Sequence, residues 1–571
     1  MIDLLAAPDR AGFGITAALD IEGIPYRHIA RPEDSDGRLV VAVNEAATPV
    51  VALARRTPVL AIGVATALAR EHFGVSGEVR EGPASIALDE PVWPAAVREC
   101  ARRFGREALR IPQAPVFSPA ARPTGSARAH LSFPGGERQP AVVRCGGVHW
   151  CLVDLGSALA NLLDERYAAG DGRPAPRPMS RTAFLLYYRA PEPIRRLVQR
   201  SVYAWLRRGV ARCTTSSDYP VDATGWLLLE LVRELVRGAA GGLVRLARWP
   251  APYAAAAVLS HDVEPTSFAY TRGLEQLAAD VDRSGHPATV GLVARPARHL
   301  TRPAAAWLRG RDVLCHGLEH RGETLAGSRA QVADGLGTAR AEIEARLGRS
   351  VDGFRSPRLD RSPDLVWALD RVGFRYDSSY PDVDRENVSR FGAGVRLNVP
   401  FRAPVGDGAE RVRPSRCLEL PVSAPDCVQP LFAGDDVYAL RAAVTRKIGF
   451  VRATGGLYVG IVHAGVFGPR DAALRAEHLR FVAARLRHRD LWLASASDVA
   501  AWWGARELVV LRVREDRAVV KNDGDETVEG LCLVIDSGGD ETVRQLPALS
   551  PGESVSVAIE RRAPADAAVG R

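Results

Sequence analysis

Apolar residues between positions 254 and 504 fall into short continuous runs, separated by longer stretches in which they recur at helical spacing. Runs of about 4–8 apolar residues are typical of buried strands, and recurrence at i, i+3 and i+4 is typical of amphipathic helices. Because the two patterns alternate, they predict βα units built on a parallel sheet. The predicted strands are 254–260, 288–294, 312–317, 353–357, 418–423, 456–464 and 491–497, and the clearest helices are 329–348 and 362–373.

Residues 1–168 carry the same alternation, with strands predicted at 38–44 and 57–64 and helices at 11–24 and 65–74. A strand, a Gly146–Gly147 turn, a second strand and a helix close this segment, which predicts a three-layer α/β accessory domain. In outline it resembles the glutamine-amidotransferase-like fold, although it has no nucleophile-elbow motif. The Gly12-x-Gly14 pair is a weak phosphate-loop signal, and a turn followed by a helix is its preferred interpretation.

Two further segments flank residues 251–504. Residues 169–250 begin with the linker-like GDGRPAPRPMSR and continue with helical periodicity in 185–210 and 223–249. The basic faces of these helices fit a solvated surface, and peripheral contact with a membrane or an acidic partner is the alternative. Residues 505–562 show short alternating strands that predict a small β-sandwich, and 563–571 are predicted to be a frayed tail.

The composition indicates a globular chain of several domains, because 571 residues exceed one ordinary core and 47% of them are hydrophobic. The formal net charge of +8 comes almost entirely from arginine, since Lys447 and Lys521 are the only lysines. Most of the arginines are interleaved with acids, as in RAEIEARLGRS, so we expect no nucleic-acid partner.

The sequence shows neither a targeting signal nor a cysteine framework. It opens with MIDLLAAPDRAG, which lacks a basic n-region, and no apolar run approaches the roughly 20 residues needed to cross a bilayer. We therefore expect no transmembrane segment and a cytoplasmic location. The eight cysteines contain no CxxC pair, so neither a cysteine zinc site nor a set of disulfides is expected.

The strand predicted at 254–260 runs directly into His261-Asp262-Val263-Glu264. An ordinary buried strand stays apolar to its end, whereas this one ends in a histidine and two acids. In α/β folds ligands bind beyond the carboxyl ends of the strands. These side chains are therefore candidates for a functional site.

A histidine pair, His316 and His320, follows the strand predicted at 312–317. In a helical turn, side chains at i and i+4 share a face, so both imidazoles would reach one ion. Two neutral imidazoles and one carboxylate, with positions left open for solvent, form a hydrolytic zinc site.

Two later strand ends add an arginine and a further histidine. Arg355 and Pro357 stand in DGFRSPRLD, and His463 ends the apolar run of YVGIVHAGVFG. A single histidine in such a place is normally a core residue. Here it is the last of an ordered series of acids, HxxxH, Arg-x-Pro and His, and the series predicts one shared site.

These motifs, LSHDVE, HGLEH, FRSP and IVHAG, resemble in order and spacing those of the polysaccharide deacetylases, the NodB-homology carbohydrate esterases. The resemblance covers roughly residues 254–504 and implies a distorted (β/α) barrel over 251–504. It also implies a divalent metal, usually zinc, held by one carboxylate and the two histidines. A second carboxylate is then the base, Arg355 orients that base, and His463 is the acid.

The first motif departs from the commonest family pattern of two adjacent aspartates and leaves two assignments open. On the Asp-x-Asp pattern of other members, Asp262 is the base and Glu264 joins the two histidines as a metal ligand. This assignment is preferred, because residues two apart on a strand point the same way. On the adjacent pattern, Asp262 is the metal ligand and His261 takes the base position. Arg358 replaces the aromatic that commonly follows Arg-x-Pro, which changes the expected shape of a sugar pocket.

The activity that the resemblance implies is hydrolysis of a non-peptide C–N bond, namely N-deacetylation of an N-acetylated sugar or glycan precursor. The alternative is a non-catalytic glycan- or partner-binding protein built on a degenerate deacetylase barrel, which the altered first motif favours. Four further residues have mainly structural interpretations: Asp377 as a brace, Glu419 as a strand-end acid, and Trp502 and Trp503 as core.

Overall fold

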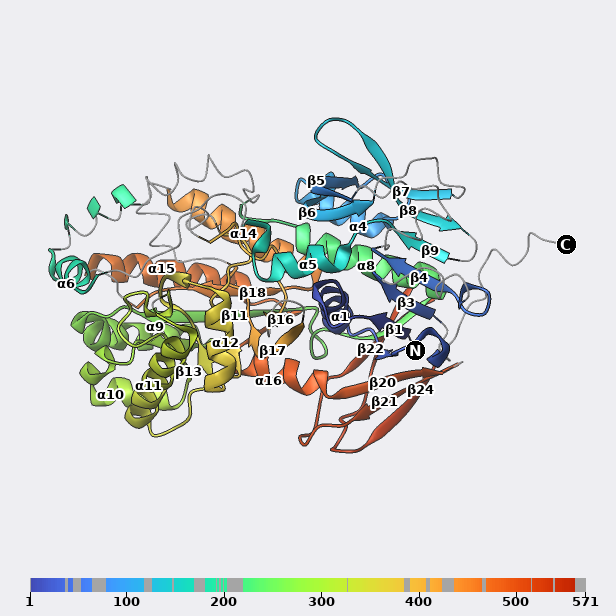
Figure 1. Cartoon of the computed structure of the whole chain (residues 1–571). Helices are drawn as coiled ribbons and strands as arrows, with labels where there is room; N and C mark the ends of the chain where they lie inside the picture. Colours follow the sequence, from blue (N-terminus) through green and yellow to red (C-terminus); the bar gives the residue numbers. More distant parts are fainter. Residues whose placement is uncertain are drawn as a thin grey trace.

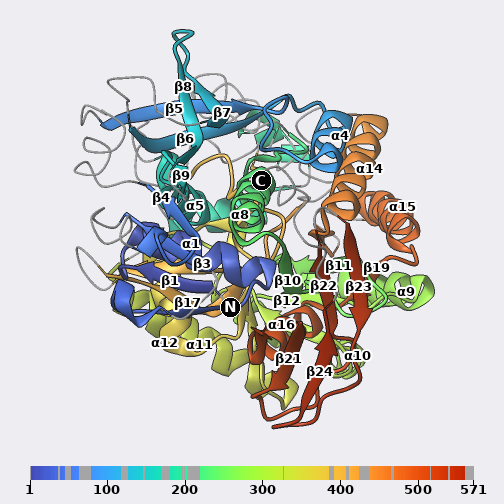
Figure 2. The same ribbon diagram turned by 90° about the vertical axis from the view of Figure 1, so that its right-hand side faces the viewer.

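The computed structural model forms two nine-stranded sheets and two three-stranded sheets in the residues that it describes (Figures 1 and 2). The described residues are 2–35, 39–44, 53–63, 79–117, 126–145, 148–168, 180–191, 193–194, 197–198, 200–202, 219–325, 327–384, 391–406, 411–423, 436–464, 469–514, 516–537 and 540–559.

The N-terminal sheet is parallel in one half and antiparallel in the other. Its parallel half has the order β2 (Tyr26–His28), β1 (Ile2–Ala6), β3 (Leu39–Val43), β4 (Val59–Ile62) and β9 (Val148–Cys151), and its antiparallel half continues with β8 (Arg138–Cys145), β7 (Ser126–Ser132), β5 (Val79–Ala87) and β6 (Ala108–Phe117). The strands predicted at 38–44 and 57–64 are confirmed as β3 and β4. The predicted Gly146–Gly147 turn and the helix at 65–74 lie outside the described residues.

Three helices pack on one face of this sheet and form its main core, namely α1 (Arg10–Glu22), α5 (Leu155–Leu163) and α8 (Thr224–Ala240). The prediction of a separate helical segment at 169–250 differs from this arrangement. The apolar residues of α8, among them Trp226 and Leu231, are buried in the same core as β3 and β4. A helix that is apolar over most of its surface must be covered by other elements on most of its sides. The N-terminal sheet covers one side of α8.

The basic face predicted for 223–249 is also neutralised inside the molecule. Arg233 pairs with Glu230, and Arg237 pairs with Glu234 at 2.5 Å, each at i, i+3 spacing along α8. The alternative of membrane contact is therefore wrong for α8. Among the helices that the structure describes, none is long and apolar enough to cross a membrane.

Two glycines allow α1 and α5 to cross in direct backbone contact. A Cβ atom on Gly14 would lie 1.9 Å from the carbonyl oxygen of Gly156, and one on Gly156 would lie 2.0 Å from that of Ala11. Gly12 is equally crowded, since its Cβ would lie 2.0 Å from the carbonyl oxygen of Ala7. The Gly12-x-Gly14 pair thus has a packing explanation, in line with its preferred interpretation as a turn and helix start.

The second large sheet is a curled half-barrel of mostly parallel strands. The order is β16 (Phe401–Gly406), β17 (Val412–Glu419), β15 (Tyr376–Asp377), β14 (Gly353–Phe354), β13 (Asp312–Cys315), β12 (Thr289–Leu292), β11 (Ala255–Val263) and β18 (Leu457–Ile461), and β19 (Leu491–Ala494) also pairs with β11. The alternation of strands and helices predicted for this region is confirmed. The antiparallel hairpin of β16 and β17 begins earlier than the strand predicted at 418–423.

Helices cover the outer face of the half-barrel and form its core with the strands, namely α9 (Leu274–Ser284), α10 (Arg302–Arg309), α11 (Arg329–Leu347), α12 (Pro363–Val372), α14 (Val437–Thr454) and α15 (Pro469–Leu486). The inner face packs against α16 (Ala496–Glu507). Trp502 and Trp503 of α16 are buried there, and the Trp502 indole N–H donates to the carbonyl oxygen of Arg248 at 2.8 Å. They are core residues, as expected.

The C-terminal β unit consists of two small sheets that share the α16 core. One sheet contains β20 (Val509–Arg514), β21 (Arg517–Asn522) and β24 (Ser554–Ala558), and the other contains β10 (Leu243–Leu246), β22 (Cys532–Asp536) and β23 (Glu541–Gln545). The short alternating strands predicted here are present, but β10 comes from outside the predicted range 505–562. The predicted tail lies outside the described residues.

The helix crossing yields a stability prediction. Gly14→Ala is expected to destabilise the chain by at least about 2 kcal/mol, because its Cβ meets the backbone of α5 and neither helix can yield locally. The matched control is Gly335→Ala in α11, where a Cβ meets nothing within 4 Å. That change is expected to be neutral or to stabilise by up to about 1 kcal/mol. Thermal unfolding of the two variants beside the parent chain measures both changes in stability. Equal changes would contradict the direct backbone contact between α1 and α5.

Candidate functional site

The predicted residues are brought together at the carboxyl ends of the half-barrel strands. Asp262 stands near the end of β11, which is buried along its whole length. His316 and Arg355 directly follow β13 and β14, and His463 follows β18 on the other side of β11. Because these strands run parallel, their carboxyl ends meet at one edge of the sheet, where α/β folds place ligands.

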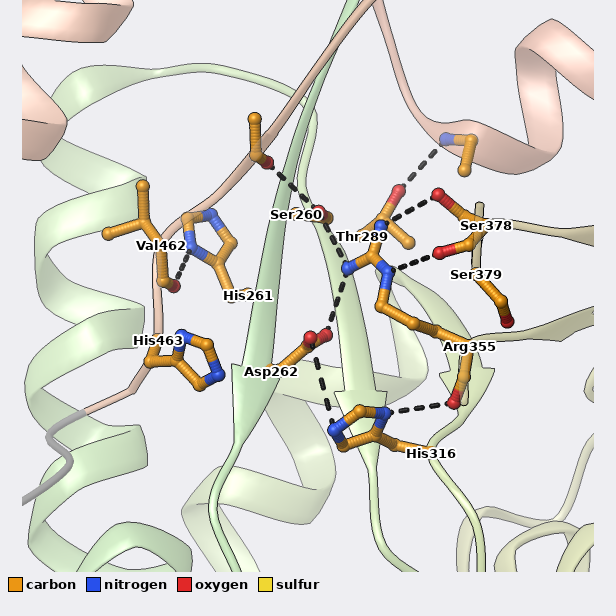
Figure 3. A network of polar contacts seen from close by, with 12 residues as sticks. Ser260, His261, Asp262, Thr289, His316, Arg355, Ser378, Ser379, Val462 and His463 are labelled. Carbon is orange, nitrogen blue, oxygen red and sulfur yellow. Dashed lines mark hydrogen bonds and ion pairs between the residues drawn. The ribbon is translucent and has the colours of Figure 1, made fainter. Parts of the chain in front are cut away.

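An ion pair between Asp262 and Arg355 lies at the centre of the site (Figure 3). Arg355 Nη1 donates to Asp262 Oδ1 and to Ser260 Oγ, each at 2.9 Å. Ser378 holds the rest of the guanidinium, since Nε donates to its carbonyl oxygen at 2.9 Å and Nη2 to its hydroxyl oxygen at 3.0 Å. Burial raises the pKa of Asp262, but the charge of Arg355, its hydrogen bond and the neighbouring His316 and His463 together outweigh burial and hold that pKa well below its ordinary value. Asp262 is therefore ionised at neutral pH.

His316 is oriented through its Nδ1 atom. This nitrogen lies 2.9 Å from the carbonyl oxygen of Arg355, which only accepts, so Nδ1 carries the hydrogen and the Nε2 lone pair stays free. Nε2 faces Asp262 Oδ2 at 3.9 Å. Burial lowers the pKa of His316 to about 4, so the ring is neutral at pH 7. A neutral imidazole is the form that binds metal ions.

Glu264 lies next to the other two histidines of the series. Its carboxylate is 4.0 Å from His320 Nε2 and 3.4 Å from His463 Nε2. His320 is close to His316, with ring centroids 5.0 Å apart. Of the histidine pair, Asp262 thus faces His316 and Glu264 faces His320.

The segment from His316 to His320 is an irregular turn, not the helical turn that the i, i+4 spacing predicts. His320 has a φ of 66°, in the region that few residues other than glycine adopt. The Glu323 carboxylate accepts hydrogen bonds from four consecutive backbone N–H groups, those of residues 318–321, at 2.7–3.2 Å. Sequence reasoning missed Glu323. The available signal was an acid shortly after the histidine pair, where a carboxylate can bind the N–H groups of a turn.

His261 points away from Asp262, toward Val462 (Figure 3). Its Nδ1 lies 3.0 Å from the Val462 carbonyl oxygen, and its Nε2 lies 3.3 Å from His286 Nε2. Because the carbonyl only accepts, Nδ1 is the donor and Nε2 accepts from His286. Both nitrogens of His261 are used on this side of the strand, which weighs against the assignment with His261 as the base.

The three preferred ligands and Asp262, the ligand of the alternative assignment, have donor atoms that suit a divalent metal. The carboxylates of Asp262 and Glu264 and the imidazoles of His316 and His320 are the donor types of a zinc site. The two carboxylate–imidazole pairs span 3.9 and 4.0 Å, whereas two ligands of one tetrahedral zinc lie roughly 3.3 Å apart. As they stand, no three His, Cys, Asp or Glu side chains in the described part of the chain converge closely enough to hold an ion. The donor types thus suit a metal, and each pair would have to close by about half an ångström to bind one.

Asp377 and Glu419 form a buried pair at the ends of β15 and β17. Burial raises the pKa of both carboxyl groups, that of Asp377 to about 6. Asp377 accepts from the Ser379 hydroxyl at 2.5 Å, and Glu419 accepts from the Tyr380 N–H at 3.0 Å. The pair thus braces the segment that carries Ser378, the partner of the guanidinium, which agrees with the bracing interpretation of Asp377.

The central ion pair predicts a non-additive pair of substitutions. Arg355→Met leaves Asp262 buried without its cation and is expected to cost about 3–5 kcal/mol of unfolding free energy. The double variant Asp262→Leu/Arg355→Met removes both charges and is expected to be more stable than Arg355→Met alone. Urea unfolding of the two variants and the parent measures the difference. A double variant less stable than the single one would contradict the pairing.

The buried His261–His286 contact predicts a pH dependence. Burial lowers the pKa of His286 to about 4, so between pH 6.5 and 4 the unfolded chain takes up a proton that the folded chain does not. This group therefore makes stability fall as the pH falls, by up to about 1.4 kcal/mol per pH unit. His286→Asn is expected to flatten the stability–pH profile in that window. The exposed His299→Asn is the control and should leave the parent profile unchanged; parallel profiles for His286→Asn would refute the prediction.

Comparison with known proteins gives likenesses of fold. No protein-family model matches the sequence, and no curated protein matches it. A protein from Mycobacterium smegmatis assigned as a polysaccharide deacetylase is 21% identical over 47% of this chain and 96% of its own, with a TM-score of 0.34. A CE4 family pseudoenzyme from Bacillus anthracis is 13% identical over 43% of this chain and 65% of its own, with a TM-score of 0.28.

A third solved structure, the carbohydrate deacetylase Agd3, is similar to the whole chain. It is 11% identical over 98% of both chains, with a TM-score of 0.36. Solved structures similar to this chain thus include deacetylases and a pseudoenzyme. At these TM-scores the likenesses assign no activity to this chain.

Proposed function

We propose that the chain is a metal-dependent hydrolase of non-peptide C–N bonds that removes the N-acetyl group of a sugar or glycan precursor. The observation that carries the proposal is the environment of Asp262. A buried carboxylate is held ionised by Arg355 and faces a neutral imidazole at the carboxyl ends of parallel strands. Buried, strongly perturbed groups that converge on one point are typical of active sites.

The proposed ligands of the metal are Glu264, His316 and His320. A bound divalent ion, zinc being the usual one for two histidines and a carboxylate, would polarise the acetamide carbonyl and lower the pKa of a bound water toward about 7. The His316 Nδ1–H bond to the Arg355 carbonyl keeps Nε2 aimed at the site, and Glu323 keeps His320 in place through the turn. These contacts would hold the two proposed ligands ready before an ion binds.

Asp262 is the proposed general base. Its Oδ1 is occupied by Arg355, which keeps Oδ2 on the side of His316 and free to accept a proton from water. Arg355 acts through Asp262 by orienting it and by keeping it ionised. A base with a pKa well below neutral is weak, and removal of a proton from a water that is already acidified would offset that weakness.

His463 is the proposed general acid. It follows β18 and lies 3.4 Å from Glu264, on the opposite side of the acids from Arg355. A proton given from its imidazolium to the sugar nitrogen would let the amine leave as the C–N bond breaks. Water and substrate would thus lie between a base held by Arg355 and an acid that follows the neighbouring strand.

The first test is the metal content of the purified full chain, by elemental mass spectrometry, beside His316→Ala. We expect about one divalent ion per parent chain and at least a tenfold loss in His316→Ala. His149→Ala, which removes a buried histidine of the N-terminal sheet, is the matched control and should retain the ion.

The same proteins are then assayed for acetate release from an N-acetylated chito-oligosaccharide. Asp262→Asn is expected to retain the ion but to lose at least about a hundredfold of the rate, since general-base catalysis contributes 10²–10⁴-fold. A metal-free parent chain, even after incubation with zinc, would refute the metal-dependent hydrolase. It would favour the non-catalytic glycan-binding alternative.

A further inference from the structure

His261 binds the backbone directly before the proposed acid, His463. Its Nδ1–H group donates to the carbonyl oxygen of Val462 at 3.0 Å (Figure 3). That carbonyl belongs to the planar peptide group that joins Val462 to His463. Its direction is therefore coupled to the backbone angles from which the His463 side chain starts. The ring of His261 thus bears on where the His463 imidazole points.

The rest of this segment is attached to β11 through its backbone. The Val462 N–H donates to the carbonyl oxygen of Ser260 at 2.8 Å, and the Ala464 N–H donates to that of Asp262 at 3.0 Å. These two bonds continue the parallel pairing of β11 with β18 beyond the end of β18. Between them lies the Val462–His463 peptide group, whose carbonyl oxygen is the one that the histidine ring binds.

A second buried histidine holds His261 in the form that donates to Val462. His286 Nε2 lies 3.3 Å from His261 Nε2, and His286 Nδ1 lies 2.6 Å from the Ser284 hydroxyl oxygen. Because His261 Nε2 accepts, His286 Nε2 carries the hydrogen, and a neutral His286 then accepts at Nδ1 from the Ser284 hydroxyl. The hydrogen bonds run in one direction from Ser284 to Val462, so they fix the tautomer of both rings.

The position of His261 would ordinarily hold an apolar side chain. Its ring is fully buried, and the residues two places before and after it in β11, Leu259 and Val263, belong to the core between the sheet and its helices. An imidazole costs free energy there unless its nitrogens are hydrogen-bonded, and both are. The histidine supplies a bond to the backbone that the apolar side chains on either side of it cannot make.

We propose that His261 is a positioning residue for general-acid catalysis, held by His286 and acting through the Val462 carbonyl oxygen. The inference rests on the proposed function, in which the His463 imidazolium gives its proton to the nitrogen that leaves. Loss of the bond from His261 removes one restraint on the Val462–His463 peptide group and lets the imidazole move out of line for that transfer. A misplacement of about 1 Å can cost roughly a hundredfold in rate.

The experiment compares His261→Leu with His261→Asn in the full chain, on two substrates. Leucine fills the site but has no donor, whereas the asparagine amide N–H stands near the place of Nδ1. One substrate is an N-acetylated chito-oligosaccharide, whose amine needs a proton to leave, and the other is 4-nitrophenyl acetate, whose phenolate leaves without one. In His261→Leu we expect acetate release from the oligosaccharide to fall at least tenfold and ester hydrolysis to change less than about threefold. His261→Asn should stay within about threefold of the parent on both.

His149→Leu is the matched control, because it replaces a buried histidine of the N-terminal sheet, and it should keep both rates. Equal losses on the two substrates in His261→Leu would overturn the proposal, since a site that is only destabilised loses both activities. Equal rates of His261→Leu and His261→Asn would overturn it as well. If His261→Leu does not fold, His286→Leu takes its place, because it removes the donor to His261 Nε2, and the same selective loss is expected.

Crystal structures of the same variants separate this inference from the proposed hydrolysis. We expect His463 Nε2 to leave its position 3.4 Å from the Glu264 carboxylate in His261→Leu and to keep it in His261→Asn. An unmoved His463 in His261→Leu would overturn the positioning role, whatever the rates. A parent chain that cleaves neither substrate would refute the hydrolase, and the position of His463 in the variants would still decide whether His261 holds it.

Discussion

The candidate site depends on one buried ion pair. Arg355 has no exposed surface and Asp262 has almost none, so each charge is tolerated only because the other is in contact with it. The guanidinium also binds Ser260 and Ser378, and the backbone carbonyl of the same residue orients His316. One arginine thereby joins the end of β11, the segment after β15 and the first histidine of the HxxxH turn.

Buried polar contacts join the half-barrel that carries this pair to the N-terminal part of the chain. Arg361 pairs with Glu165, which comes from the N-terminal part, at 2.8 Å. The Tyr167 hydroxyl donates to the carbonyl oxygen of Gly394 at 2.6 Å, and Arg248 pairs with Glu22 of α1. Breaking a buried pair leaves an uncompensated charge, so these contacts resist separation of the N-terminal part from the half-barrel. The N-terminal part and the half-barrel therefore share buried contacts, although the sequence pattern suggests separate domains.

Local pattern predicted most of the half-barrel, because each strand is a compact apolar run and each helix a periodic one. β11, β12, β13, β18 and β19 are examples. It failed where an element depends on a distant partner. β10 is a four-residue strand that forms by pairing with β22. The sequence of α8 resembles that of a free amphipathic helix, and only the fold shows that it packs in the core of the N-terminal sheet. The HxxxH turn was predicted with the wrong local shape, because its backbone is bound by Glu323.

The sequence by itself determined at which end of the strands the candidate residues stand, since this follows from local periodicity and the direction of parallel strands. Tertiary structure decided which neighbour each side chain meets. His261 and Asp262 are adjacent in sequence, yet one is bound to Val462 and His286 and the other to Arg355. Alternation along a strand separates their directions, but only the packed fold supplies those partners, because they come from residues 25 to 201 positions away.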